Sequence, residues 1–302
     1  MANFSLAPTS KRRGEKVVRG FLFAAAGLSV VVTIGILASL LIPAVAFLRE
    51  VPIIEFLTGT RWAPRFEPAS FGVLPLVVGT LWTTVIALSV AVPIGLGIAI
   101  FLSEYASRKN RKFIKPVIEL LAGIPTVVYG FFALEFFTQT ILKEWLSLEV
   151  GSFSVLSAGF VMGIMIVPTI ASISEDALNA VPQGLRQGSF ALGANKMQTT
   201  IKVVIPAALS GIAAAIVLGI SRAVGETMIV SLAAGNRPNI SLNPLEGAQT
   251  MTGFIANAAL GDSRVGSVEY NTLFAVGALL FLLTLLINMI SIRLVRKFRQ
   301  AY

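Results

Sequence analysis

The chain has 302 residues, of which 55% are hydrophobic and only 13% are charged, whereas soluble domains carry about 25% charged residues, so the composition predicts an integral membrane protein. Because the chain contains no Cys and no His, the sequence excludes a disulfide framework, a thiolate nucleophile, imidazole metal sites and His-based acid–base catalysis. The net charge of +9 does not indicate a nucleic-acid partner, because the basic residues lie between apolar runs and form no stripe with interleaved aromatic residues.

Taken in chain order, the apolar runs predict about six transmembrane helices, because crossing a hydrocarbon core of ~30 Å takes ~20 apolar residues of helix. The uncharged runs are residues 20–48, 68–103, 151–173 and 270–292, and the runs that contain charges are residues 116–142 and 203–236. Prolines inside these runs predict kinks or broken turns. Pro75, Pro93, Pro125 and Pro168 are among them. The sequence therefore predicts an all-α membrane fold, without a soluble domain large enough for chemistry of its own.

The first apolar run follows a basic tail, residues 1–18, that carries no recognisable motif. The run ends near Ala44 and Ala46, and a basic tail, an apolar run and small residues in this order are typical of a secretory signal with its cleavage site. A signal core has ~7–15 residues, and this run is far longer. We therefore expect an uncleaved membrane anchor.

Lys and Arg gather on one side of the predicted membrane when the six runs alternate in direction. The clusters on that side are residues 11–19, 108–115, 186–202 and 293–299. By the positive-inside rule this side is cytoplasmic, so we expect both termini there. The outer loops, residues 49–68 and 237–269, are too polar to embed and long enough to form a docking surface.

The longest predicted cytoplasmic connection, residues 174–206, contains a short amphipathic helix. Pro182 suits the first turn of a helix, where its missing N–H costs nothing, and Gly193 suits the left-handed residue that ends one. Leu185, Ser189 and Leu192 fall on one face at spacings i, i+4 and i+7. Such a face needs something to pack against, either lipid headgroups or another protein.

This helix and the residues after it resemble the EAA loop of ABC importer permeases, whose pattern is E-A-A-x-x-x-G followed further on by I-x-L-P. Gln187, Gly188 and Ser189 occupy the E-A-A positions, and Gly193 and Pro206 keep the glycine and the proline. The resemblance implies a coupling loop over about residues 182–211 that docks in a groove of a separate ATPase subunit. The residues expected to make this contact are Leu185, Gln187, Gly188, Ser189, Leu192 and Gly193.

ATP and Mg would be bound by that ATPase and not by this chain. Gly188 and Gly193 have the G-x4-G spacing of a phosphate-binding Walker loop, but Ala194 stands where the loop requires Lys. We therefore expect no nucleotide, metal or other cofactor on this chain.

Three further segments indicate which group of ABC importer permeases the chain resembles. Residues 70–81 (Ser-Phe-Gly-Val-Leu-Pro and then Gly-Thr-Leu), 122–130 (Ala-Gly-Ile-Pro-Thr-Val-Val-Tyr-Gly) and 222–228 (Arg-Ala-Val-Gly-Glu-Thr-Met) are similar, in this order, to the PstC family of permeases of phosphate importers. This implies a type I ABC importer transmembrane domain over residues 19–302, in a prokaryotic plasma membrane. It also implies a second related permease, an ATPase homodimer and an extracytoplasmic phosphate-binding protein as partners. The expected function is ATP-driven import of inorganic phosphate, with another oxyanion such as molybdate or sulfate as the alternative.

Arg222 and Glu226 place charges near the middle of an apolar run, where a charged residue costs at least ~2.5 kcal/mol on insertion scales. At spacing i, i+4 on one helix, the carboxylate would reach the guanidinium. Such a pair would either brace two helices or line the substrate path, where Arg222 would offer a bidentate fork to a phosphate and Glu226 would hold Arg222 between substrates. An enzyme would usually gather several acids or a metal cluster at one interface, and the sequence does not indicate one.

Overall fold

The computed structural model describes residues 13–297, and helices make up most of them. The long helices are α1 (Arg13–Glu50), α3 (Leu74–Ile100), α6 (Val155–Asn179), α9 (Ile205–Val224) and α11 (Val268–Lys297). The short helices are α2 (Ile53–Thr58), α4 (Arg108–Ala122), α5 (Thr126–Phe131), α7 (Gln183–Ala191), α8 (Lys196–Thr199) and α10 (Met251–Ala259). Four π-helical segments are η1 (Phe101–Tyr105), η2 (Phe132–Trp145), η3 (Thr200–Val204) and η4 (Val230–Ala234). Two short strands, β1 (Trp62–Ala63) and β2 (Ser70–Phe71), pair antiparallel. The all-α prediction is confirmed.

The described chain has five helical segments long and apolar enough to cross a membrane, and a sixth if one bent pair of helices forms a single span. The five segments are Gly14–Glu50, Leu74–Tyr105, Val155–Asn179, Lys196–Val224 and Val268–Arg293. The prediction of about six transmembrane helices is therefore confirmed, although the segment that contains α9 begins earlier than expected, because α8 and η3 join it.

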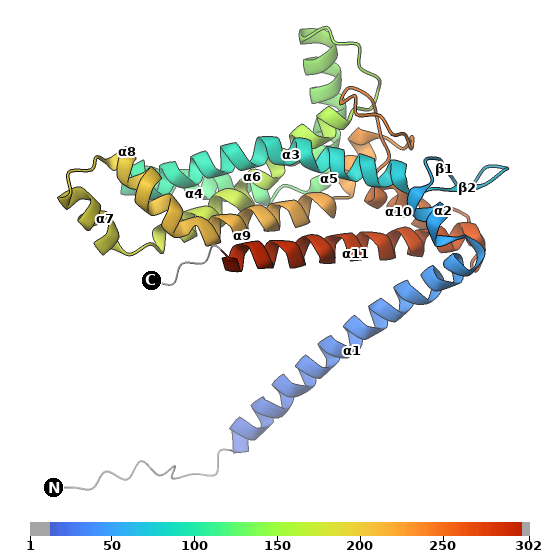
Figure 1. The fold of residues 1–302 in the computed structure, drawn as a ribbon, viewed down its shortest axis with the longest axis horizontal. Coiled ribbons are helices and arrows are strands. Elements are labelled where there is room, and N and C mark those ends of the chain that lie inside the picture. Colours follow the sequence, from blue (N-terminus) through green and yellow to red (C-terminus); the bar gives the residue numbers. More distant parts are fainter. Residues whose placement is uncertain (1–12, 298–302) are drawn as a thin grey trace.

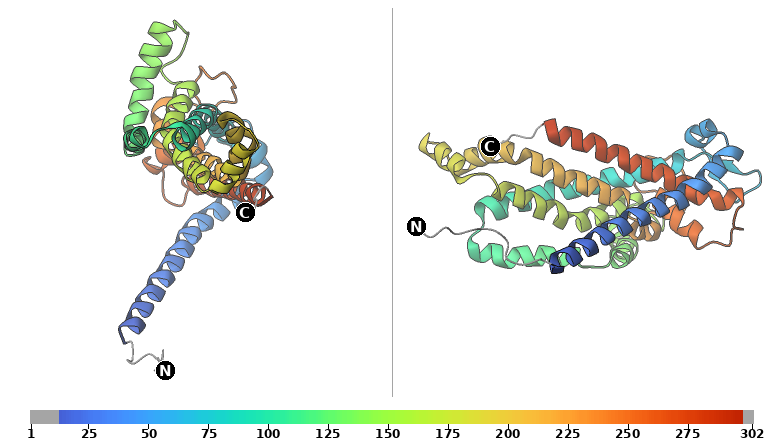
Figure 2. Two further views of the ribbon diagram at one scale, coloured as in Figure 1. Left: turned by 90° about the vertical axis from the view of Figure 1, so that its left-hand side faces the viewer. Right: turned by 90° about the horizontal axis from the view of Figure 1, so that it is seen from below.

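The central helix of the bundle is α6. It packs against α3 and α9, and α11 packs in turn against α9 (Figures 1 and 2). In the apolar window of α6, 67% of the residues are buried, against 11% in α1. Close approach of α3 and α6 depends on Gly163, where a Cβ would lie 2.7 Å from the carbonyl oxygen of Ala87. Small residues at such contacts let membrane helices pack closely.

The first helix stands away from the bundle over most of its length. It contacts α11 near its own C-terminal end and diverges from there (Figure 1). Ala44 and Phe47 are buried in this contact region, whereas the apolar side chains of the first half, such as Phe23 and Val31, are exposed. A helix that is apolar on all sides requires lipid or another protein around it.

The apolar run predicted at residues 116–142 is broken. α4 ends at Ala122, α5 begins after Pro125, and the two halves of the span meet at 83°. Proline fixes its own φ and disfavours the helical conformation in the residue before it, so the break predicted at Pro125 is confirmed. Helices α3 and α6 continue through Pro93 and Pro168, and Pro75 lies in the first turn of α3, where proline is compatible with a helix.

The two ends of the bundle differ. We call the end formed by α2, the β1–β2 hairpin and α10 the hairpin end, and the end formed by η1, α7 and α8 the loop end (Figure 1). At the hairpin end, Phe56, Trp62 and Phe254 belong to one buried apolar cluster. Gly59 and Gly72 touch, since a Cβ on Gly72 would lie 2.4 Å from the Cα of Gly59. This contact seats the hairpin on α2.

Candidate functional site

Arg222 lies in the last turn of α9, which packs against α6, and α5 packs against η4, the next helical segment of the chain. Its Nη1 donates a hydrogen bond to Oγ1 of Thr169 in α6 at 2.9 Å. Gly130 of α5 approaches the segment after Arg222, since a Cβ on Gly130 would lie 3.2 Å from the carbonyl oxygen of Met228. The hydroxyl of Tyr129 donates to the carbonyl of Leu121 at 2.7 Å, across the break in the bent span. The half-buried Arg222 therefore lies near the end of a helix whose following segment packs on α5, the helix just beyond the break.

Glu226 does not pair with Arg222, so this expectation was wrong. α9 ends before Gly225, and the two charged residues are not on one helix. Oε1 of Glu226 instead accepts hydrogen bonds from the backbone N–H groups of Met228 at 3.1 Å and Ile229 at 3.3 Å. These are free N–H groups at the start of the next helical segment, and Glu226 therefore caps its N-terminus.

The guanidinium of Arg222 has no carboxylate within salt-bridge distance among residues 13–297. An arginine offers five N–H donors, and the described contact with Thr169 uses one of them. An oxyanion could therefore receive both positive charge and paired hydrogen bonds at this position.

The short helix predicted in the loop is α7. Pro182 precedes its first residue, and Gly193 adopts the left-handed conformation with φ +82°, as expected of a helix stop. Leu185 packs into the apolar cluster at the loop end, and the hydroxyl of Ser189 lies 2.9 Å from that of Thr199. These two residues form the inner face of α7.

The outer side of α7 is free in the described chain. Gln187 and Gly188 are exposed, and Leu192 is 90% exposed. The prediction that Leu185, Ser189 and Leu192 share one face was therefore wrong, because Leu185 and Ser189 face inward. The helix ends one residue earlier, and Leu192 takes a non-helical cap conformation. Phe190 and Met197 are exposed as well, so the loop end presents several large apolar side chains, which is typical of an interaction surface.

Arg186 is a buried residue of α7 that sequence reasoning had counted only as a basic loop residue. It is 8% exposed. Its Nη2 donates to Oε1 of Glu104 at 2.9 Å and to the carbonyl of Leu178 at 2.8 Å, and its Nη1 donates to the carbonyl of Val181. The helical period held a signal, because Arg186 lies three residues before the inward Ser189 and so falls on the same face.

A second set of ion pairs joins α4 to α6 at the loop end. Glu175 of α6 is 0% exposed. Nη2 of Arg111 lies 2.6 Å from Oε1 of Glu175, and Nζ of Lys115 lies 3.2 Å from its Oε2. Lys115 also lies 3.5 Å from a carboxylate oxygen of Asp176. The two cations of α4 therefore share one buried carboxylate.

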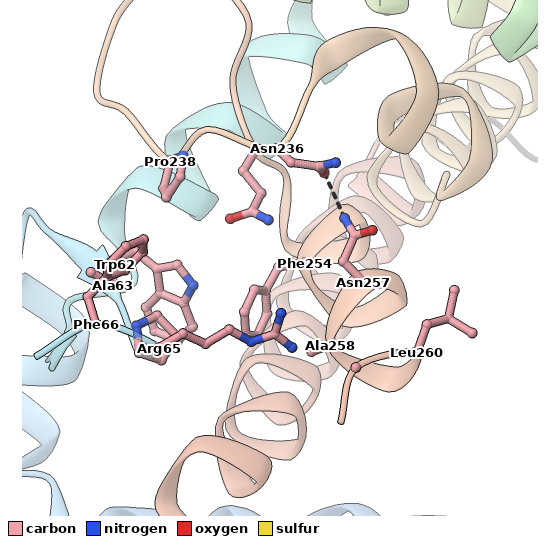
Figure 3. Close-up of a pocket in the computed structure, with 13 residues that line it drawn as sticks. Trp62, Ala63, Arg65, Phe66, Asn236, Pro238, Phe254, Asn257, Ala258 and Leu260 are labelled. Atoms are coloured by element: carbon pink, nitrogen blue, oxygen red, sulfur yellow. Dashed lines mark hydrogen bonds between the residues drawn. The ribbon is translucent and has the colours of Figure 1, made fainter. Parts of the chain in front are cut away.

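A cavity of about 510 Å³ lies at the hairpin end, between the β1–β2 turn and α10 with the residues that follow it (Figure 3). It brings together the two loops predicted to form a docking surface. The indole Nε1 of Trp62 is buried there without a hydrogen-bond partner in the described chain. Gln249 lines the cavity and is 7% exposed, and Nε of Arg65 donates to Glu269 at 2.9 Å. The cavity therefore offers N–H donors in a largely apolar wall.

Similarity to known proteins extends over most of the chain. The sequence is 42% identical over 244 residues to the probable ABC transporter permease protein YqgH of Bacillus subtilis. This match covers 80% of this chain and 78% of that protein. It is 36% identical over 254 residues to the phosphate transport system permease protein PstC of Mesorhizobium japonicum, with 78% and 76% covered. It is 30% identical over 281 residues to the probable PstC of Methanocaldococcus jannaschii, with 84% and 87% covered.

Solved structures share the fold. A chain of a bacterial ABC transporter involved in the import of the acidic polysaccharide alginate matches with a TM-score of 0.66 and 15% identity, over 96% of this chain and 100% of that chain. An inward-facing structure of the MetNI methionine ABC transporter matches with a TM-score of 0.55 and 22% identity, over 76% and 95%. The fold is thus that of a type I ABC importer transmembrane domain. Since residues 91–300 also match the family described as binding-protein-dependent transport system inner membrane component, the chain belongs to this family of ABC transporter permeases.

Proposed function

We propose that this chain is a transmembrane permease subunit of an ATP-driven importer of inorganic phosphate. The observation that carries the proposal is its identity of 36% and 30%, over most of its length, to relatives named as phosphate transport permeases. The positive charge of Arg222 inside the bundle agrees with an anionic substrate. The chain itself performs no chemistry in this proposal.

Arg222 is the proposed substrate ligand in the translocation path. A phosphate that leaves water needs compensating charge, and a guanidinium held by Thr169 presents that charge in a fixed orientation. Glu226 belongs to the same path in a supporting role, because its capping bonds fix the start of the segment that follows Arg222. A second, related permease would supply the other wall of the path.

Transport would be driven by a separate ATPase homodimer that binds ATP and Mg. The exposed side of α7, with Gln187, Gly188 and Leu192, is the proposed contact with one ATPase subunit. Leu185 and Ser189 hold the helix from the inside, and the left-handed Gly193 ends it. Movement of the ATPase would therefore act on α7 as a body.

The proposed orientation places the loop end in the cytoplasm of a prokaryotic cell and the hairpin end outside. The basic residues at the start of α4 and near α8 support it, because cytoplasmic loops carry an excess of Lys and Arg. Both chain termini would then be cytoplasmic. The tail predicted at residues 1–18 lies mostly outside the described residues, as do residues 298–302.

The cavity at the hairpin end is the proposed docking site for an extracytoplasmic phosphate-binding protein. Trp62, Gln249 and Arg65 line the cavity, and Nε1 of Trp62 is buried without a hydrogen-bond partner in the described chain. An acceptor group of the binding protein, such as a carboxylate or a backbone carbonyl, would satisfy the buried indole N–H, which is costly to leave unpaired.

The proposed substrate is tested by reconstituting this chain with its second permease, its ATPase and its binding protein in lipid vesicles. We expect phosphate to stimulate ATP hydrolysis and to accumulate in the vesicles, and sulfate and molybdate to do neither. If sulfate or molybdate stimulated ATP hydrolysis and phosphate did not, that anion would be the substrate in place of phosphate. The family assignment would not change.

A further inference from the structure

We infer that two sets of ion pairs at the loop end, each built on a buried carboxylate, fasten α7 to the half-span α4, so that movement of the coupling helix is carried to the bend of that span and toward Arg222. The inference rests on the proposed function, because it gives these side chains a positioning role in ATP-driven import. None of them needs to touch phosphate or nucleotide.

The first set fixes α7 to η1 and to the end of α6. The side chains of Arg186 and Glu104 are each only 9% exposed, and their contact spans 82 residues of sequence. Two backbone carbonyls, of Leu178 and Val181, accept further hydrogen bonds from the same guanidinium. Separating such a pair would strand a buried charge, which is strongly unfavourable, so α7 and η1 should move together.

A short polar bridge continues from this pair to α6. The Ser103 hydroxyl lies 3.2 Å from Oε1 of Glu104 and 3.2 Å from Oδ1 of Asn179. Nδ2 of Asn179 lies 3.5 Å from Oε1 of Glu175. The first set of ion pairs is therefore connected to the second through two uncharged side chains.

The second set holds α4 against α6. The carboxylate of Glu175 forms ion pairs with both Arg111 and Lys115, with N···O distances of 2.6 Å and 3.2 Å. α4 has no fully buried residue of its own, and apolar side chains such as Phe113 and Leu120 are exposed. Because hydrophobic packing does so little for this helix, the ion pairs are the contacts that set its position.

The far end of α4 leads to the candidate substrate site. α4 ends at Ala122, one residue after the carbonyl of Leu121 that accepts the hydrogen bond of Tyr129. Gly130, the next residue, packs against the segment that follows Arg222, since a Cβ on Gly130 would lie 3.2 Å from the carbonyl oxygen of Met228. A displacement of α4 would therefore change the bend of 83° and the surroundings of the guanidinium together.

The variants Glu104→Gln and Glu175→Gln test the inference, because each removes one buried carboxylate charge and keeps the shape of the side chain. The matched control is Lys112→Gln, which removes a charge from the exposed side of α4, where the described chain has no ion pair for it. In vesicles that contain the complete complex, we measure phosphate imported per ATP hydrolysed. We expect both carboxylate variants to hydrolyse ATP but to import about 2- to 30-fold less phosphate per ATP, and the control to match the wild type.

The double variant Glu104→Gln, Glu175→Gln distinguishes a connected path from two independent braces. If one path runs through both carboxylates, the double variant should lose little more coupling than the worse single variant. Losses that add fully, or a normal import ratio in both single variants, would overturn the inference.

A distance measurement keeps the inference testable should a carboxylate variant assemble poorly. Because the chain has no Cys, spin labels can be placed at Lys112→Cys on α4 and Met197→Cys on α8, both exposed positions. We expect a narrow distance distribution that ATP does not broaden in the wild type, and a broad one in Lys115→Gln, which weakens the second set but leaves Arg111 in place. Equally narrow distributions in both would contradict the inference. A wild-type complex that imports no phosphate would instead contradict the proposed function.

Discussion

At the scale of single residues, Arg222 is a charge whose described hydrogen-bond partner is a neutral hydroxyl, that of Thr169. A charge inside a membrane protein is costly unless other groups compensate for it, and Glu226 is engaged elsewhere by the backbone N–H groups that it caps. The site is therefore electrostatically incomplete in this chain, and an anion passing through the bundle would complete it.

Replacing Arg222 should impair transport without preventing assembly. Arg222→Gln removes charged hydrogen bonds that are typically worth about 1.5–3 kcal/mol each, so we expect phosphate uptake per assembled complex to fall about 10- to 100-fold. Arg222→Lys should be intermediate, because lysine keeps the charge and lacks the bidentate fork. Uptake of radiolabelled phosphate, normalised to complex in the membrane, measures both. Normal uptake by Arg222→Gln would remove Arg222 from the path.

Glu226 should act mainly on stability. Glu226→Ala removes a helix cap, which typically costs about 0.5–2 kcal/mol, and should lower the melting temperature of the purified complex. Glu226→Gln keeps an acceptor oxygen and should lose less. Because the two residues do not pair, the effects of Arg222→Gln and Glu226→Ala on melting should add. A double variant more stable than the sum of its single changes would instead indicate an ion pair in another state of the transporter.

Trp62 should contribute to recognition of the binding protein. Trp62→Phe deletes the unpaired N–H and keeps an aromatic ring beside Phe254, whose ring centroid lies 4.9 Å from that of Trp62. We expect a Kd for the binding protein about 2- to 10-fold higher, as for the loss of one hydrogen bond. Trp82→Phe is the control, because its Nε1 also lacks a partner in the described chain but lies outside the cavity. The docking proposal would be contradicted if both variants raised the Kd equally or if neither variant changed it.

At the scale of helices and loops, the coupling helix depends on how it ends. Gly193 has φ +82° and open space around its Cα, so a side chain there would meet backbone strain and no steric clash. Gly193 is therefore needed for the backbone conformation with which the chain leaves α7.

Gly193→Val should uncouple the ATPase from transport. A side chain in the left-handed region costs about 1–2 kcal/mol, enough to shift the end of α7 and its exposed residues. We expect reduced uptake and ATP hydrolysis that no longer responds to phosphate, with normal insertion of the membrane spans. The control is Gly184→Ala, also in open space but at an ordinary helical position. Normal, phosphate-responsive hydrolysis in Gly193→Val would show that α7 is not the coupling contact.

The sequence was informative where one residue decides the local backbone. Pro182 and Gly193 lie at the two ends of α7, and Pro125 breaks its own span. Proline fixes its φ, and glycine tolerates a positive φ, so each of these residues determines the backbone where it stands. The end of α9 before Gly225 was missed, and with it the role of Glu226, whose side chain bonds to backbone N–H groups of the next segment. The pair of Arg186 and Glu104 was missed as well, because partners 82 residues apart leave no local pattern.

At the scale of the whole molecule, the distribution of basic residues gives the bundle a direction. Single cysteines at Met197, at the loop end, and at Asp262, at the hairpin end, should react with a membrane-impermeant thiol reagent from opposite sides. Both positions are exposed, and the chain contributes no cysteine of its own. We expect Asp262→Cys to be labelled in intact cells and Met197→Cys only after permeabilisation. Labelling of both from one side would contradict the orientation and the six-span arrangement.

The separation of α1 from the bundle also bears on how the subunit is made. Among the described helices α1 is synthesised first, and with 11% of its apolar window buried it can settle in lipid before any later helix exists. α6 has the opposite character, because 67% of its window is buried and it carries the buried Glu175. It therefore needs α3, already in place, and α9, still to come. α1 is thus the self-sufficient span and α6 the dependent one, and we expect the insertion machinery to retain α6 longest.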